Sequence, residues 1–450
     1  MHTACGVVDL FLYANEVRSR AGLVPDLSKR SAPVGVCASC QAVDYLPERD
    51  TPAPGGQEPP KVFCEVCKKT EMRAIDAREP KGFVSDLRPE DYDGALEWNA
   101  RATRPTLSVR CRADAVPVGN VEVATTTDDV LSINDDGGKG GFDFQQGSAF
   151  GSQREGLYVV SPRPDSKLRG NGASYRIALL ARRRTDLLLV DMAGWPDGVF
   201  ADPQNAEGRA AWYSFSFFLR LAAAARLDVD PTELDASFRV IERNQEPIGQ
   251  AFLSDKLENG AGYCRWFGQK ENFEELMLQA DPLMNKSIAQ QWTDRTVVPG
   301  PLASKPHGEE CDTSCNRCLR DFQNLPYHGL LDWRLALDMA RIATGGATVD
   351  LSSPWETTIP NPWTGLLDGP EASIPATMDR LGYATALSFA GMAGFVHRDK
   401  TRVRLACHPL WTELHSRFVA ARIEAEQQFP GAAVTRMNPF RLLRRPADYV

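Results

Sequence analysis

The residues with the most distinctive chemistry are three cysteines that lie close together in the second half of the chain. Cys311, Cys315 and Cys318 follow the spacing C-x3-C-x2-C, and His307 lies four positions before the first of them. Thiolate sulfur and imidazole nitrogen are the donors that hold zinc in structural tetrahedral sites. Because this spacing lets one short loop supply three sulfur donors, it predicts a zinc site.

This site needs a fourth ligand, and the sequence offers three candidates. His307 is preferred because it keeps the whole ligand set within one local segment, whereas His328 and the more distant Cys264 are the alternatives. Three buried free thiols are the competing interpretation, since cysteine is among the most buried residue types. Three cysteines within eight residues are hard to explain as core filling, so metal binding is favoured.

A second cysteine pattern lies nearer the N-terminus. Cys37 and Cys40 form one C-x2-C pair, Cys64 and Cys67 form another, and 23 residues separate the two pairs. This spacing is typical of a zinc ribbon, in which two tight turns point four thiolates at one ion. A thioredoxin-like redox centre would need one such pair at the start of a helix instead of two matched pairs. Four thiolates leave no open position for water, so we expect a structural site.

Three segments resemble a known protein family: CDTSCNRCLRDFQN (311–324), YHGLLDWRLALDMA (327–340) and LENGAGYCR (257–265). They are similar to the MrfA-type zinc-binding (MZB) domain. This domain lies at the C-terminal end of a family of bacterial helicases and in helicase-partner proteins of anti-phage defence islands. Among those partner proteins, the sequence is most like the DrmB type of the DISARM system. The resemblance runs from about residue 35 to about residue 340.

The resemblance implies a zinc-binding accessory subunit that works with a DNA helicase encoded in trans and meets DNA through that complex. It implies an antiviral role without a motor of its own. The sequence has no G-x4-G-K-[ST] phosphate-binding loop, and GGKGG (137–141) lacks the hydroxyl residue that would hold magnesium. We therefore expect the chain itself not to be an enzyme.

The composition is that of a globular protein from a reducing compartment. The 450 residues are 43% hydrophobic and 24% charged, with a formal net charge of −8. Eleven cysteines, seven of them in the two clusters, favour metal binding in the cytoplasm over disulfides. No apolar run approaches the ~18 residues that a membrane span requires. The acidic balance argues against strong DNA binding by the chain alone, because such proteins usually carry a basic excess.

A short basic run is the candidate contact to nucleic acid. Arg182, Arg183 and Arg184 precede the apolar, strand-like segment TDLLLVD (185–191). Arginine side chains in such a run could contact a phosphate backbone. The alternative is a solvated strand end, because a short run of charge carries little information.

The segment LENGAGYCR lies between a predicted strand over 248–255 and a predicted helix over 271–279. Its position suits a phosphate-binding turn at a helix N-terminus. It also suits a structural turn in which Gly260 and Gly262 adopt positive φ. Acidic residues on the predicted helix oppose a bound anion, so the structural turn is favoured.

The second function class is a stand-alone metal-dependent nuclease with its site in residues 376–450. His408, with Asp399 nearby in the sequence, is the best catalytic candidate there. No G-x-S-x-G or H-E-x-x-H motif accompanies them, and the chain has six histidines. A lone histidine is a poor basis for catalysis, so the accessory-subunit hypothesis is preferred.

Hydrophobic periodicity predicts a multidomain α+β protein. Short β-branched and aromatic segments fill 105–190, and helices are expected over 9–20, 207–226, 330–342 and 412–428. A Pro- and Trp-containing stretch after residue 350 has the composition of a linker. The expected divisions are an N-terminal segment (1–35), a zinc ribbon (36–90), an MZB-like α+β domain with the cysteine cluster (91–350), a linker (351–375) and a small α/β unit (376–450).

Overall fold

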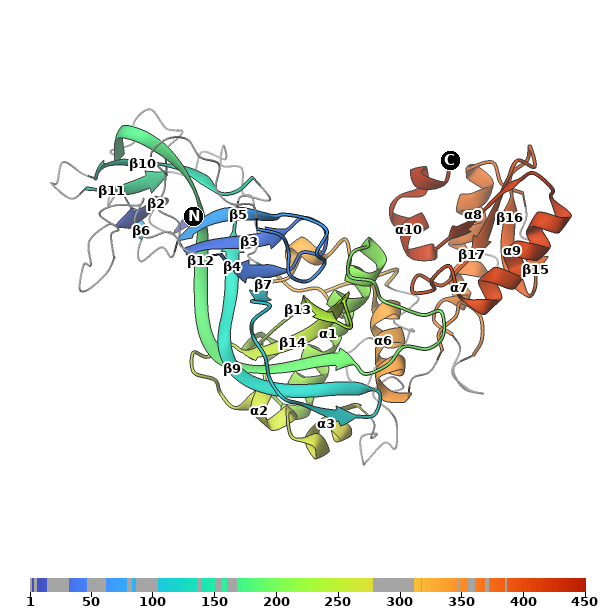
Figure 1. Cartoon of the computed structure of the whole chain (residues 1–450), viewed down its shortest axis with the longest axis horizontal. Helices are drawn as coiled ribbons and strands as arrows, with labels where there is room; N and C mark the ends of the chain where they lie inside the picture. The colour runs from blue at the N-terminus through green and yellow to red at the C-terminus, as the bar shows by residue number, and fades with distance from the viewer. Residues whose placement is uncertain are drawn as a thin grey trace.

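The structure is a computed structural model that combines two β-sheets with helices (Figure 1). The α+β multidomain class predicted from the sequence is confirmed. The described residues are 2–3, 6–13, 32–46, 62–78, 83–85, 104–135, 139–149, 155–159, 168–277, 311–316, 318–345, 348–354, 361–368, 372–384 and 387–450. No helix within these ranges is both long and apolar enough to cross a bilayer.

The larger sheet is built around two long strands, β9 (Val121–Asn134) and β12 (Leu168–Met192). They pair antiparallel over 14 residues of β9, and both bend along their length in Figure 1. The sequence predicts short strands over 105–190, and the structure joins some of them into these two long strands. Polar residues at the expected breaks lie opposite one another in the ladder, with Arg184 opposite Asp129. Such a cross-strand pair of opposite charges stabilises continuous pairing.

The described part of this sheet has 14 strands, and β12 pairs with four of its neighbours. The remaining strands are β1 (His2–Thr3), β2 (Gly6–Tyr13), β3 (Ala32–Cys37), β4 (Val43–Tyr45), β5 (Met72–Arg78), β6 (Phe83–Ser85), β7 (Arg104–Leu107), β8 (Ala115–Val118), β10 (Phe142–Ala149), β11 (Glu155–Val159), β13 (Leu234–Arg243) and β14 (Glu246–Asp255). Because β5 pairs in parallel with β12, strands β3, β4 and β5, which flank the turns of the two C-x2-C pairs, are continuous with the large sheet.

The helix expected over 9–20 is wrong where the structure describes it. Gly6–Tyr13 forms strand β2, which pairs with β6 and β11, and residues 14–20 lie outside the described ranges. A short apolar run cannot distinguish helix from strand by its periodicity alone. Pairing with strands far away in the sequence decides the outcome.

Two helices form the centre of the core beside this sheet, α1 (Ala206–Leu227) and α6 (Trp333–Gly345). Asn205 caps α1, because its Oδ1 accepts the Gly208 N–H at 2.7 Å. α1 packs on β13 and β14 and also against α6, so it is buried on more than one side. The shorter helices are α2 (Tyr263–Phe267), α3 (Lys270–Met277), and the 3-10 turns η2 (Pro231–Glu233) and η3 (Leu325–Tyr327).

The C-terminal residues form a four-stranded sheet in the order β15-β16-β17-β18. Its strands are β15 (Leu387–Phe389), β16 (Met392–Val396), β17 (Arg402–Ala406) and β18 (Ala433–Met437), and its helices are α7 (Thr364–Leu367), α8 (Ser373–Arg380), α9 (Ser416–Gln428), α10 (Pro439–Arg444) and η4 (Pro446–Tyr449). α9 connects β17 to β18, which run parallel. This arrangement is the small α/β unit that the sequence predicts.

The basic C-terminal tail docks on the rest of the chain. Arg441 pairs with the buried Glu207 of α1 at 2.8 Å, and Asn438 Nδ2 donates to the same carboxylate at 2.8 Å. Arg444 donates to the carbonyl oxygens of Gly329 at 2.8 Å and Leu331 at 3.1 Å. Arg441 and Arg444 are therefore engaged within the chain.

Candidate metal centres

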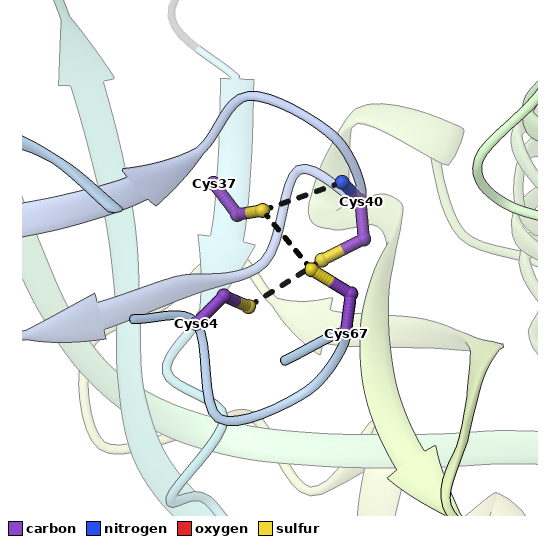
Figure 2. Close-up of side chains that lie close together, drawn as sticks. All are labelled: Cys37, Cys40, Cys64 and Cys67. Carbon is purple, nitrogen blue, oxygen red and sulfur yellow. Dashed lines mark hydrogen bonds between the residues drawn. The ribbon is translucent and has the colours of Figure 1, made fainter. Parts of the chain in front are cut away.

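Four thiols converge where the turn after β3 meets the turn that leads to β5 (Figure 2). Cys37 Sγ lies 3.6 Å from Cys67 Sγ, and Cys40 Sγ lies 3.6 Å from Cys64 Sγ. All four sulfur atoms are within 4.8 Å of one another. The structure therefore brings together the four residues of the predicted ribbon site, which come from two segments far apart in the sequence.

The two turns have the same backbone construction. The Gln41 N–H donates to the Cys37 carbonyl oxygen at 3.0 Å, and the Lys68 N–H donates to the Cys64 carbonyl oxygen at 3.0 Å. Gln41 and Lys68 have positive φ angles of 63° and 55°. In each turn, a left-handed residue directly after the second cysteine reverses the chain, so that both thiols of the pair face inward.

The distances and the burial suit a tetrahedral metal ion. Sulfur ligands about 2.3 Å from zinc would be about 3.8 Å apart at the corners of a tetrahedron. Burial raises the pKa of the Cys37 thiol, and the hydrogen bond to Cys64 together with burial raises the pKa of Cys40. Buried thiols this close do not ionise together without a cation, because their negative charges repel. A bound divalent cation would supply the positive charge that makes four thiolates stable.

The second cluster contains the three cysteines that follow residue 310. Cys318 Sγ lies 3.9 Å from Cys311 Sγ and 3.7 Å from Cys315 Sγ. The Cys315 backbone N–H donates to Cys318 Sγ at 3.1 Å. The neighbouring Cys311 thiol raises the pKa of Cys318 to about 12. This trio offers three sulfur donors to one ion.

The fourth ligand of the trio stays a prediction. His307, the preferred candidate, lies outside the described residues. His328 is engaged elsewhere, because its Nε2 lies 2.8 Å from Asn324 Oδ1 and 3.0 Å from the Asp321 carbonyl oxygen. Cys264 is not part of the cluster, and within the part of the chain that the structure describes no other His, Cys, Asp or Glu joins the three sulfurs.

Helix α6 begins directly on the loop that carries the trio. The Trp333 indole Nε1 donates to the Cys311 carbonyl oxygen at 3.0 Å, and its backbone N–H donates to the Thr313 carbonyl oxygen at 2.8 Å. Arg334 donates to the Asp312 carbonyl oxygen. The first turn of α6 therefore binds the metal loop, and both thiol clusters belong to one continuous hydrophobic core with α1 and α6.

The Gly-containing turn 257–265 is already filled by a carboxylate of the chain. Asp255 is fully buried, and its Oδ2 accepts the backbone N–H groups of Ala261 at 2.7 Å and Gly262 at 2.7 Å. It also accepts from Tyr263 at 3.2 Å and, through Oδ1, from Cys264 at 3.0 Å. The Asp255 carboxylate occupies the place that a phosphate would take. The geometry therefore supports a structural turn over a phosphate-binding one.

The three arginines of the basic run do not share one surface. Successive side chains of a strand point to opposite faces, so Arg183 faces away from Arg182 and Arg184. Arg183 pairs with Asp235 at 2.6 Å, and Arg184 lies 4.0 Å from Asp129. A phosphate contact shared by all three is therefore excluded by the geometry of β12.

His408 and Asp399 do not form a catalytic pair. His408 is fully buried and its Nε2 lies 2.9 Å from Asp338 Oδ2, while its Nδ1 accepts the Leu410 N–H. Asp399 pairs instead with His397 at 2.7 Å. A fully buried imidazole cannot reach a phosphodiester, so the proposed nuclease centre has no support from this geometry.

Comparisons with known proteins give a partial match. No protein-family model matches the sequence. Over 193 residues, the chain is 31% identical to the Druantia protein DruE of Escherichia coli (strain UMEA 4076-1), a match that covers 41% of this chain and 9% of that protein. The chain thus spans under a tenth of the length of that relative.

A solved structure of a DUF1998 helicase, MrfA, bound to DNA is similar with a TM-score of 0.30 and 11% identity. The likeness covers 51% of this chain and 24% of that chain. A TM-score this low does not establish a shared fold. The sequence identity with the Druantia protein is therefore the more informative of the two similarities.

Proposed function

We propose that this chain is a zinc-binding accessory subunit of a DNA helicase in bacterial anti-phage defence. The observation that carries the proposal is the pair of thiol clusters in one continuous core, with all four sulfurs of the first within 4.8 Å. Sites built of thiolates alone hold zinc for structure, since they leave no open position for a reacting water. The chain then acts as a rigid surface on which other macromolecules assemble.

The helicase partner follows from the family resemblance. The segments around Cys311 and Leu257 resemble the MZB domain, which occurs in helicases and in their partner proteins. The chain has no phosphate-binding loop motif of its own, so the motor would be a separate polypeptide. Similarity to a Druantia protein over 41% of the chain is compatible with this assignment.

The chain with its two metal centres would function in the cytoplasm. The ten described cysteines are all free thiols, and the clustered ones need a reducing environment to remain metal ligands. Contact with DNA would occur within the helicase complex, with the exposed Arg182 and Arg184 as candidate phosphate contacts.

A DrmB-type role in a DISARM system is the finer assignment that we propose. It predicts genes for a helicase and a DNA methyltransferase beside the gene for this chain. A neighbourhood with neither gene would refute the DISARM assignment and leave the accessory role to the biochemical test.

That test combines metal analysis with two activity assays. We expect two equivalents of zinc in the purified chain, and a rise in the DNA-dependent ATPase rate of the neighbouring helicase when the chain is added. Cleavage assays with Mg²⁺ or Mn²⁺ should give no product with the chain alone. Well under two equivalents of zinc, no effect on the helicase, or cleavage by the chain alone would contradict the proposal.

A further inference from the structure

A cavity of about 330 Å³ is lined in part by the segment that follows the cysteine trio, and no residue of either thiol cluster lines it. Strands β12 and β13 supply one part of its lining, α1 another, and the segment just after Cys318 a third. Arg183, Arg220, Lys256 and Phe322 are among the lining residues. This volume is at the lower end of the range for small-ligand pockets, so it admits one nucleotide and excludes a duplex.

The cavity carries an excess of positive charge. Arg183 and Lys256 share Asp235, at 2.6 Å and 2.8 Å, and Arg220 pairs with Asp321. Three cations and two carboxylates leave a local net charge of +1, in a chain whose formal net charge is −8. Arg183 and Arg220 each keep a buried Nε–H that no described residue accepts. The site therefore favours an anionic group.

An exposed aromatic ring lies next to these cations. Phe322 is 74% exposed, although burial of a phenylalanine side chain normally stabilises a protein by about 1.5–3 kcal/mol. The Phe217 and Tyr327 rings, whose centroids are 5.8 Å apart, line the same cavity. Surfaces that combine cations with aromatic rings suit single-stranded nucleic acid, because bases stack on the rings while phosphates meet the cations.

We propose that this cavity binds a nucleotide of single-stranded DNA, with its base stacked on Phe322 and its phosphate beside Lys256 and Arg183. This inference rests on the proposed function and names the form of DNA that the accessory subunit engages. The cysteine trio would position the aromatic wall. Phe322 follows Cys318 by four residues, and Asn324 Nδ2 fixes the segment by donating to the Leu319 carbonyl oxygen at 2.7 Å.

The test is a fluorescence-anisotropy titration of the purified chain with fluorescein-labelled oligo(dT) of about 20 nucleotides at low salt. Phe322→Ala should raise the Kd about tenfold, which is the loss of one stacked base. Lys256→Gln should lower the slope of log K against log salt by about 0.7, which is the loss of one phosphate contact on a single strand. Both side chains are well exposed, at 74% for Phe322 and 44% for Lys256, so the variants should fold.

Two exposed residues of the C-terminal unit supply matched controls. Leu414→Ala removes an apolar side chain that is 83% exposed, and Lys400→Gln removes one positive charge. Both should bind the oligonucleotide like the unmodified chain. Loss of binding in these controls equal to that in the cavity variants would overturn the proposal, because the effect would then be non-specific.

The result also separates this inference from the proposed function. If the chain stimulates the helicase but Phe322→Ala and Lys256→Gln bind oligo(dT) normally, the cavity is not the DNA site and the accessory role stands. If Phe322→Ala weakens only co-purification with the helicase, the cavity is a protein-docking surface and the proposal is overturned. Failure to stimulate the helicase with oligo(dT) binding intact would instead count against the accessory role alone.

Discussion

Replacing Cys315 by serine tests the second metal centre against ordinary core packing. Cys315 is the half-buried member of the trio, and its Sγ lies 3.7 Å from Cys318 Sγ. If the trio binds no metal, the substitution exchanges one small half-buried side chain for another and should cost under about 1 kcal/mol. If it holds zinc, the variant loses a ligand and with it most of the metal affinity.

The expected loss with zinc is much larger. A structural zinc ion contributes about 10–16 kcal/mol of apparent folding free energy in small isolated sites. In this larger core the Trp333 and Arg334 hydrogen bonds to the metal loop remain, and we expect a loss of about 4 kcal/mol or more, the size that distinguishes loss of a metal from an ordinary substitution. Elemental analysis should find one zinc fewer per chain. Hydrogen exchange should become faster over 311–345.

Cys111→Ser is the matched control. Cys111 is a lone thiol outside both clusters, only 4% exposed, and burial raises its pKa to about 12. Replacing this buried thiol by a more strongly hydrated hydroxyl, with Asp128 and Arg239 as neighbours, should cost at most about 1–3 kcal/mol and leave the zinc content unchanged. Burial alone thus predicts the larger loss of stability for Cys111→Ser, whereas metal binding predicts the larger loss for Cys315→Ser. An unchanged zinc content in Cys315→Ser, or a greater loss of stability in Cys111→Ser, would refute the second metal centre.

Three further predictions follow from the buried polar groups. Asp255→Ala removes the acceptor of four backbone N–H groups, so the free energy of unfolding should fall by about 4 kcal/mol, at about 1 kcal/mol per bond. Urea unfolding measures this loss, and a value under about 1 kcal/mol would contradict the role of Asp255 in holding the turn. Asp338→Ala removes the acceptor that Trp363 Nε1 and His408 Nε2 share, and it should lower the free energy of unfolding by about 3–5 kcal/mol. Limited proteolysis of the variant should then release the C-terminal unit, and a variant as resistant as the unmodified chain would refute this prediction. Burial lowers the pKa of His415, so the stability that depends on its neutral form is full above its ordinary pKa and falls as the pH drops below that value. Between pH 7 and pH 5, the melting temperature of His415→Gln should therefore fall less than that of the unmodified chain, and an equal fall would refute this role of His415.

The features that depend on local spacing could be predicted from the sequence. Two C-x2-C pairs and a C-x3-C-x2-C run each place their thiols within one or two turns of backbone, so the donors were identifiable before any fold was known. Helices α1 and α6 were predictable for the same reason, because their apolar faces repeat within a single segment.

The features that depend on long-range partners emerge only in the folded chain. The tertiary structure joined the predicted short strands into β9 and β12, and it turned Arg183 towards Asp235, away from its two neighbours. It placed Asp255 in the turn that resembled a phosphate site, and it buried His408 against Asp338. The physical reason is common to all four cases. A strand pairing or a buried charge is stabilised by a residue far away in the sequence, and that partner cannot be identified from the neighbouring residues alone.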